Sequence, residues 1–261
     1  MTDLLAIYPD LGDAITRLCG GRTWRFTGAS ALPLDTTHLY LEITKPKHWR
    51  RPGKGVEAAG QGSGLGVAGT GQAVGLARAE SHRPVAGIGA IGGSLEGDEG
   101  LVACLQREVA EEIAAPIALR SASETHLVYE EHDVETLSLA PGGIPAPILC
   151  TVSRNLYRRG ALPDAQVLAI ATFWATLEGP PQLGDLFGLL AVPLGALHEV
   201  LALPHPTVER VRSIPDVRLE TRRPMEESML LAPVWTARSL QILLRAGRLR
   251  LLPGHIPHPL A

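Results

Sequence analysis

The sequence predicts an α/β fold, and three of its features lead to that prediction. The chain has 261 residues, of which 45% are hydrophobic and 20% charged, so it can bury a sizeable core. Short segments with the apolar or alternating pattern of β-strands recur along it, and an amphipathic helix is predicted among them over residues 99–114. Strands interspersed with helices are typical of α/β domains.

The predicted elements fall into three parts of the chain. Residues 1–34 are interpreted as a helical lead, with a helix over 12–18 that Gly20 and Gly21 end. Strands are predicted over 38–44, 84–91, 125–129, 135–139, 148–152, 170–177 and 188–192, and further helices over 164–169, 194–201 and 226–246. The central domain would span 35–203, and the proline-rich residues 204–261 would form a loop-rich extension with one closing helix.

One segment of the central domain has an unusual composition. Nine glycines fall within residues 53–75, together with Ala, Ser and Gln. That glycine density cannot support a packed helix or strand, so an exposed insertion is predicted over about 53–76. A phosphate-binding loop is the alternative, but the pattern GxxxxGK[ST] is absent from the segment.

Charge and cysteine content exclude several classes of protein. The net charge of −3 creates no field that would recruit nucleic acid or an anionic membrane. Cys19, Cys104 and Cys150 are an odd, widely spaced set, which favours reduced thiols in the cytosol over a zinc cage. No secretion signal is seen at the N-terminus, and the apolar stretch 186–203 is interrupted by Pro193. We therefore expect a cytoplasmic protein without a membrane partner.

The helix over 99–114 carries acids where its apolar face continues. Its apolar stripe comprises Leu101, Leu105, Val109 and Ile113. At about 100° per residue, Glu108 and Glu112 fall within about 20° of Leu101, and Glu111 lies one step round. Partly buried like charges repel, and a hard cation such as Mg²⁺ would relieve that repulsion. Arg107 is expected to brace Glu111; the alternative is a solvated glutamate-rich face paired with arginines.

The acids belong to a longer pattern over residues 93–115. The matching residues are Gly93, Glu99, Arg107, Glu108, Val109, Glu111 and Glu112, at the spacing G-x5-E-x7-R-E-U-x-E-E, where U is bulky and apolar. The segment resembles the Nudix box of a family of hydrolases. Ala114 stands where the box has a glycine, and alanine in a left-handed conformation would cost about 1 kcal/mol. Pro116 is the alternative means of ending the helix.

The resemblance implies an enzyme that uses Mg²⁺ or Mn²⁺ to cleave the pyrophosphate bond of a nucleoside diphosphate linked to another group. It implies Glu108, Glu111 and Glu112 as metal ligands, and Glu111, Arg107 and Glu99 as catalytic residues. Gly92 and Gly93 would bind the substrate. The implied fold is an α/β/α sandwich, in which a mixed sheet lies between helices, with extensions at both ends. A general base would come from outside the box, and the candidates are Glu130, Glu131 and Glu135.

Other functions are compatible with parts of the sequence. A catalytically silent module of the same fold could bind a nucleotide as a regulator, and the insertion with the C-terminal helix could bind a partner protein. Oligomeric state is left open, a homodimer included. Residues 87–92 read GxGxxG, but they do not open directly into an apolar helix, which argues against a dinucleotide-binding fold.

Overall fold

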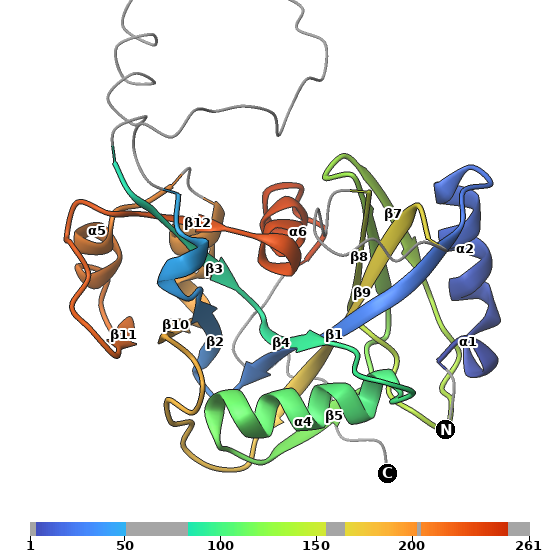
Figure 1. The fold of residues 1–261 in the computed structure, drawn as a ribbon, viewed down its shortest axis with the longest axis horizontal. Coiled ribbons are helices and arrows are strands. Elements are labelled where there is room, and N and C mark those ends of the chain that lie inside the picture. The colour runs from blue at the N-terminus through green and yellow to red at the C-terminus, as the bar shows by residue number, and fades with distance from the viewer. Residues whose placement is uncertain (1–3, 51–82, 155–164, 203–204, 250–261) are drawn as a thin grey trace, which may run out of the picture.

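The computed structural model describes residues 4–50, 83–154, 165–202 and 205–249, and it shows an α/β fold built on one large mixed sheet (Figure 1). The main path of the sheet is β11-β10-β2-β1-β9-β8-β6-β7. Strand β1 runs parallel to β9, whereas β2 and β10 pair antiparallel. The predicted α/β class with a mixed sheet is confirmed.

The strands and helices have the following bounds. The strands are β1 (Trp24–Leu34), β2 (His38–Ile43), β3 (Val85–Gly89), β4 (Ile91–Ser94), β5 (Ile117–Arg120), β6 (Thr125–Tyr129), β7 (Asp133–Leu137), β8 (Leu149–Ser153), β9 (Val167–Leu177), β10 (Gly188–Pro193), β11 (Arg218–Thr221) and β12 (Leu230–Pro233). The helices are α1 (Leu4–Ile7), α2 (Pro9–Cys19), α4 (Leu101–Ile113), α5 (Val208–Arg212) and α6 (Trp235–Arg245), with short turns of other helix types at Pro46–His48 (η1), Leu194–Ala196 (η2) and His198–Ala202 (η3).

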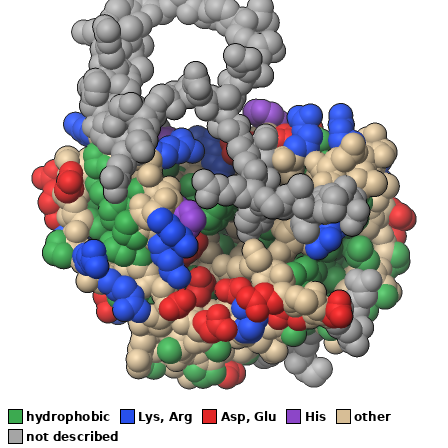
Figure 2. Space-filling view, in the orientation of Figure 1, with side chains coloured by type: hydrophobic (Ala, Val, Ile, Leu, Met, Phe, Trp, Pro, Cys, Tyr) green, Lys and Arg blue, Asp and Glu red, His purple; other side chains and the backbone are tan. Residues whose placement is uncertain are grey.

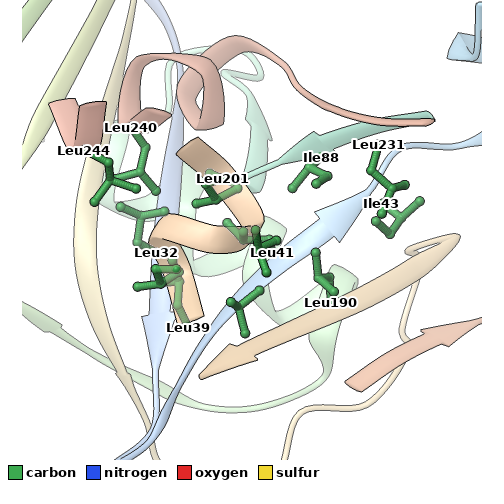
Figure 3. Close-up of a cluster of buried hydrophobic side chains, with 14 of the residues drawn as sticks. Leu32, Leu39, Leu41, Ile43, Ile88, Leu190, Leu201, Leu231, Leu240 and Leu244 are labelled. Carbon is green, nitrogen blue, oxygen red and sulfur yellow. The ribbon is translucent and has the colours of Figure 1, made fainter. Parts of the chain in front are cut away.

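Helices cover both faces of the sheet, and each face has its own core. One core joins α2 and α4 to the sheet, and Phe173 of β9 is its largest fully buried side chain. The other joins α6 and η3 to the opposite face and contains Leu32, Leu201 and Leu240 (Figure 3). Consecutive residues of β1 alternate between the two, since Ala31 belongs to the first core and Leu32 to the second. Across the residues that the structure describes, no helix has the length and apolar character needed to cross a membrane.

The sheet branches near its centre. Strand β1 meets β2 only near its end, at Leu34 and Leu39, and it pairs with β4 over residues 28–31. Strand β2 continues along β3 instead, where Glu42 lies opposite Gly89. The chain crosses from β3 to β4 through Ala90, so β4 and the end of β2 face each other across the branch.

The N-terminal prediction requires a correction. Residues 24–34 were expected in a helical lead, but they form β1, one of the two longest strands. Gly28 and Pro33 weaken its strand pattern, and only pairing along the whole of β9 reveals it. The helix of the lead is α2, which begins at Pro9 and ends at the left-handed Gly20.

Two later predictions also need correction. The helix predicted over 164–169 is wrong from Val167 onward, because these residues begin β9 and are buried on both sides. The helix predicted over 226–246 begins only at Trp235, because Leu230–Pro233 is strand β12, which lies parallel to β3. The C-terminal part thus adds strands to the sheet. The glycine-rich insertion lies outside the described residues.

Candidate active site

Helix α4 presents two of its acids to β4. Leu105 and Val109 are buried beneath it and fix the rotation of the helix on the sheet. The backbone amide of Gly92 donates a hydrogen bond of 2.9 Å to Glu112 Oε2. A Cβ added at Gly93 would lie 2.3 Å from the carboxyl carbon of Glu108. Gly93 therefore lets the carboxylate of Glu108 approach the strand backbone, and the amide of Gly92 holds Glu112.

Arg107 joins the loop before α4 to the helix. Its guanidinium holds Glu99 through two hydrogen bonds, of 2.7 Å and 3.2 Å, and donates a third, of 2.9 Å, to Glu108 Oε1. A further hydrogen bond of 3.1 Å reaches the carbonyl of Ser94. The hydrogen bond from Arg107 lowers the pKa of Glu99 to about 2. Arg107 and Glu99 thus hold the loop and orient Glu108.

Glu111 lies apart from the other acids of the box. Its side chain is 55% exposed, and it forms an ion pair with Arg107 at 3.7 Å. The expected contact between Arg107 and Glu111 is therefore longer than the contacts of this arginine with Glu99 and Glu108. Acidic side chains gather in the lower centre of Figure 2, over the region that α4 occupies in Figure 1.

A fourth carboxylate, Glu42 of β2, completes the group and was missed in the sequence. A Cβ at Gly89, its partner on β3, would lie 2.3 Å from Glu42 Oε1. Burial raises the pKa of Glu42 to about 7, and Glu108 adds to that rise while Lys45 opposes it. In a strand, residues two apart share a face, so Glu42 lies on the same face of β2 as Tyr40. That periodicity does not show that the face meets α4.

Glu112 is influenced by the same neighbours. Burial raises its pKa to about 8, and repulsion by Glu42 and Glu108 contributes, whereas the hydrogen bond from Gly92 lowers it. Glu42, Glu108 and Glu112 therefore form one poorly solvated group, which we call the carboxylate cluster. Glu42 and Glu112 therefore keep their protons to a higher pH than ordinary carboxyl groups do.

Helix α4 ends in an unusual conformation. Ala114 has φ 47° and ψ 30°, the left-handed conformation that glycine adopts most easily. The end of the helix is capped by the loop before β10, where the amides of Gly184 and Asp185 donate to the carbonyls of Glu112 and Glu111 at 3.0 and 2.8 Å. The cap keeps the last turn of the helix, and with it Glu112, in place.

A shallow pocket of about 60 Å³ opens beside the carboxylate cluster, at the branch of the sheet. Its lining includes Glu42, Gly92 and Gly93, together with Trp235 and Thr236 from the start of α6. A ligand could therefore contact the cluster and α6 together.

The three downstream candidates for a general base lie elsewhere. Glu130 pairs with Arg154, Glu131 with Arg238 and Glu135 with Arg17. All three belong to the β6–β7 hairpin, which β9 and β8 separate from β1. Their ion pairs give them structural roles, and the carboxylate from outside the box that does approach α4 is Glu42.

The chemistry of the cluster suits a hard cation. Carboxylate oxygens are the ligands that Mg²⁺ prefers, and the charge of Lys45 only partly opposes the rise in the pKa of Glu42 and Glu112. Within the described ranges, no group of three or more Asp, Glu, His or Cys side chains is arranged so that it could hold a metal ion. The residues fit the ion by donor type and by their unfavourable charge when it is absent.

Comparison with known proteins does not identify a family for this chain. No protein-family model matches the chain, and no curated protein matches it.

Proposed function

We propose that this protein is a Mg²⁺- or Mn²⁺-dependent hydrolase that cleaves the pyrophosphate bond of a nucleoside diphosphate linked to another group. The observation that carries the proposal is the carboxylate cluster, in which Glu42, Glu108 and Glu112 repel one another in a poorly solvated site. The resemblance of residues 93–115 to the Nudix box gives this cluster its reaction class, and the same resemblance extends the observed α/β fold to the Nudix type of α/β/α sandwich.

The proposal assigns roles to the residues of the site. Glu108 and Glu112 would hold the cation, with the exposed Glu111 joining from the solvent side. Such a cation neutralises diphosphate charge and lowers the pKa of a bound water. Arg107 orients Glu108 and is itself fixed by Glu99.

The remaining residues act on the substrate and the water. Glu42 accepts the proton of the attacking water, a role suited to a partly buried acid whose pKa lies near neutrality. Gly92 and Gly93 line the pocket beside the cluster, where a phosphate of the substrate would lie, and Lys45 is near enough to influence the charge of Glu112.

The test is hydrolysis of a panel of nucleoside diphosphate derivatives by the purified protein with Mg²⁺ or Mn²⁺. We expect phosphate-containing products with a subset of the panel, and a loss of about 100-fold or more in kcat for Glu112→Gln. Glu209→Gln is the matched control, because Glu209 is exposed on α5, which packs on the opposite face of the sheet. Activity unchanged by Glu112→Gln would refute the assignment, and binding without turnover would favour a nucleotide-sensing module.

A further inference from the structure

Trp235 is the one large hydrophobic side chain that the described part of the chain exposes to solvent. Its relative exposure is 44%, although tryptophan usually buries most of its surface. It also has φ 47°, which is rare for a bulky residue and strains the backbone. The exposed indole and the positive φ both cost stability, so the stability of the fold does not explain why tryptophan stands at this position.

The backbone on both sides of Trp235 is firmly held. Before it, the amide of Val234 donates to the carbonyl of Ile88 at 2.9 Å, where β12 lies along β3. After it, the hydroxyl of Thr236 lies 3.3 Å from Ser30 Oγ and 3.4 Å from Thr172 Oγ1, and all three hydroxyls are buried. These contacts fix the start of α6 to β1, β3 and β9, so the indole is presented in one place.

That place is the pocket beside the carboxylate cluster. Trp235 and Thr236 line the pocket together with Glu42, Gly92 and Gly93. With a volume of about 60 Å³, the pocket cannot enclose a nucleobase, but a planar group can lie against an exposed indole at its rim. The site thus offers an aromatic surface and a charged cluster to one ligand.

We propose that Trp235 binds the nucleobase of the substrate by stacking while the diphosphate lies over the carboxylate cluster. This inference rests on the proposed function and adds to it a specificity-determining residue from outside the box. Stacking of a base on an aromatic side chain is tolerant of base identity, because every base has a π-face. The enzyme should therefore distinguish substrates with a base from those without one more strongly than it distinguishes one base from another.

The experiment compares equilibrium binding of AMP and ribose 5-phosphate, in the presence of Mg²⁺, by calorimetry. The two ligands share the sugar and the phosphate and differ in the base. Since stacking contributes about 1–3 kcal/mol, we expect the wild-type protein to prefer AMP by about 5- to 150-fold. Trp235→Phe should keep most of that preference, and Trp235→Gly should abolish it.

Glycine is chosen because it adopts φ 47° without strain, so the variant removes the ring while relieving the backbone. Trp24→Phe is the control for loss of an indole, because Trp24 lies at the far end of β1 and packs edge-to-face on Phe26. Thermal unfolding establishes that each variant is folded. Equal binding of AMP and ribose 5-phosphate to the wild-type protein, or an unchanged preference in folded Trp235→Gly, would overturn the inference.

The two proposals fail in different ways in this experiment. A preference for AMP that requires Trp235, without hydrolysis of any substrate in the panel, supports the stacking role and rejects the hydrolase. Hydrolysis with the same KM in wild-type and Trp235→Gly enzymes supports the hydrolase and rejects the stacking role.

Discussion

Ala114→Gly should stabilise the protein, although replacing alanine by glycine at a helix usually has the opposite effect. Ala114 has φ 47°, and a residue with a Cβ loses about 1–2 kcal/mol in that conformation relative to glycine. Glycine also gains freedom in the unfolded chain, which offsets about 0.4–1 kcal/mol of the benefit. The net expectation is a gain of about 0.5–1 kcal/mol in the free energy of unfolding. For a chain of this size, that gain raises Tm by about 1–4 °C.

The assay is thermal and urea unfolding of the wild-type protein, Ala114→Gly and Ala110→Gly. Ala110 is exposed on α4 one turn before Ala114, but it lies within the helix, so the same substitution there should lower stability by about 1 kcal/mol. The two variants carry the same substitution, so a gain in stability at position 114 and a loss at position 110 can only arise from the different backbone conformations of the two positions. If both variants lose stability equally, Ala114 is not left-handed, and the account of the end of α4 is wrong.

Three further predictions follow, two from the candidate site and one from Asp35 in the turn between β1 and β2. Gly93→Ala should reduce metal-dependent hydrolysis by about 100-fold, because the added Cβ would displace the carboxylate of Glu108; kcat measures this. Glu42→Gln should raise the free energy of urea unfolding in EDTA by about 1 kcal/mol, because it removes a poorly solvated, repelled charge, and a decrease would contradict the cluster. Hydrogen bonds from Tyr40 and two backbone amides lower the pKa of Asp35 to about 2, although burial alone would raise that pKa. Asp35 therefore stabilises the fold above about pH 4, and the deficit of Asp35→Asn in unfolding experiments should disappear as the pH falls through 2.

The sequence predicted best those parts whose pattern is local. The predicted helix over 99–114 differs from α4 by one or two residues at each end. It could be predicted this closely because its own apolar stripe and the residues next to it determine the helix without distant contacts. Strand β1 was missed because Gly28 and Pro33 disguise a segment that is defined by its long pairing with β9. Non-local pairing of this kind leaves no periodic signal in the segment itself.

The site shows the same division between local and non-local information. Acids on one helix could be placed relative to one another by helical geometry, which singled out Glu108 and Glu112. Glu42 and Trp235 reach the same pocket from other parts of the chain, and only the branching of the sheet brings them there. No spacing rule connects positions 42, 112 and 235.

Several residues around the pocket lower the stability of the fold, which indicates that this region is a functional site. A sequence selected for stability alone would place apolar side chains at positions 42 and 112, where burial raises the pKa of each carboxyl group. It would not need Gly89 and Gly93, which leave the space that the acids fill. Under the proposed function, a bound cation would offset the repulsion of the acids, and a planar ligand would cover the exposed indole of Trp235. A ligand that joins a base to a metal-bound phosphate would do both, and the proposed substrate class contains such ligands.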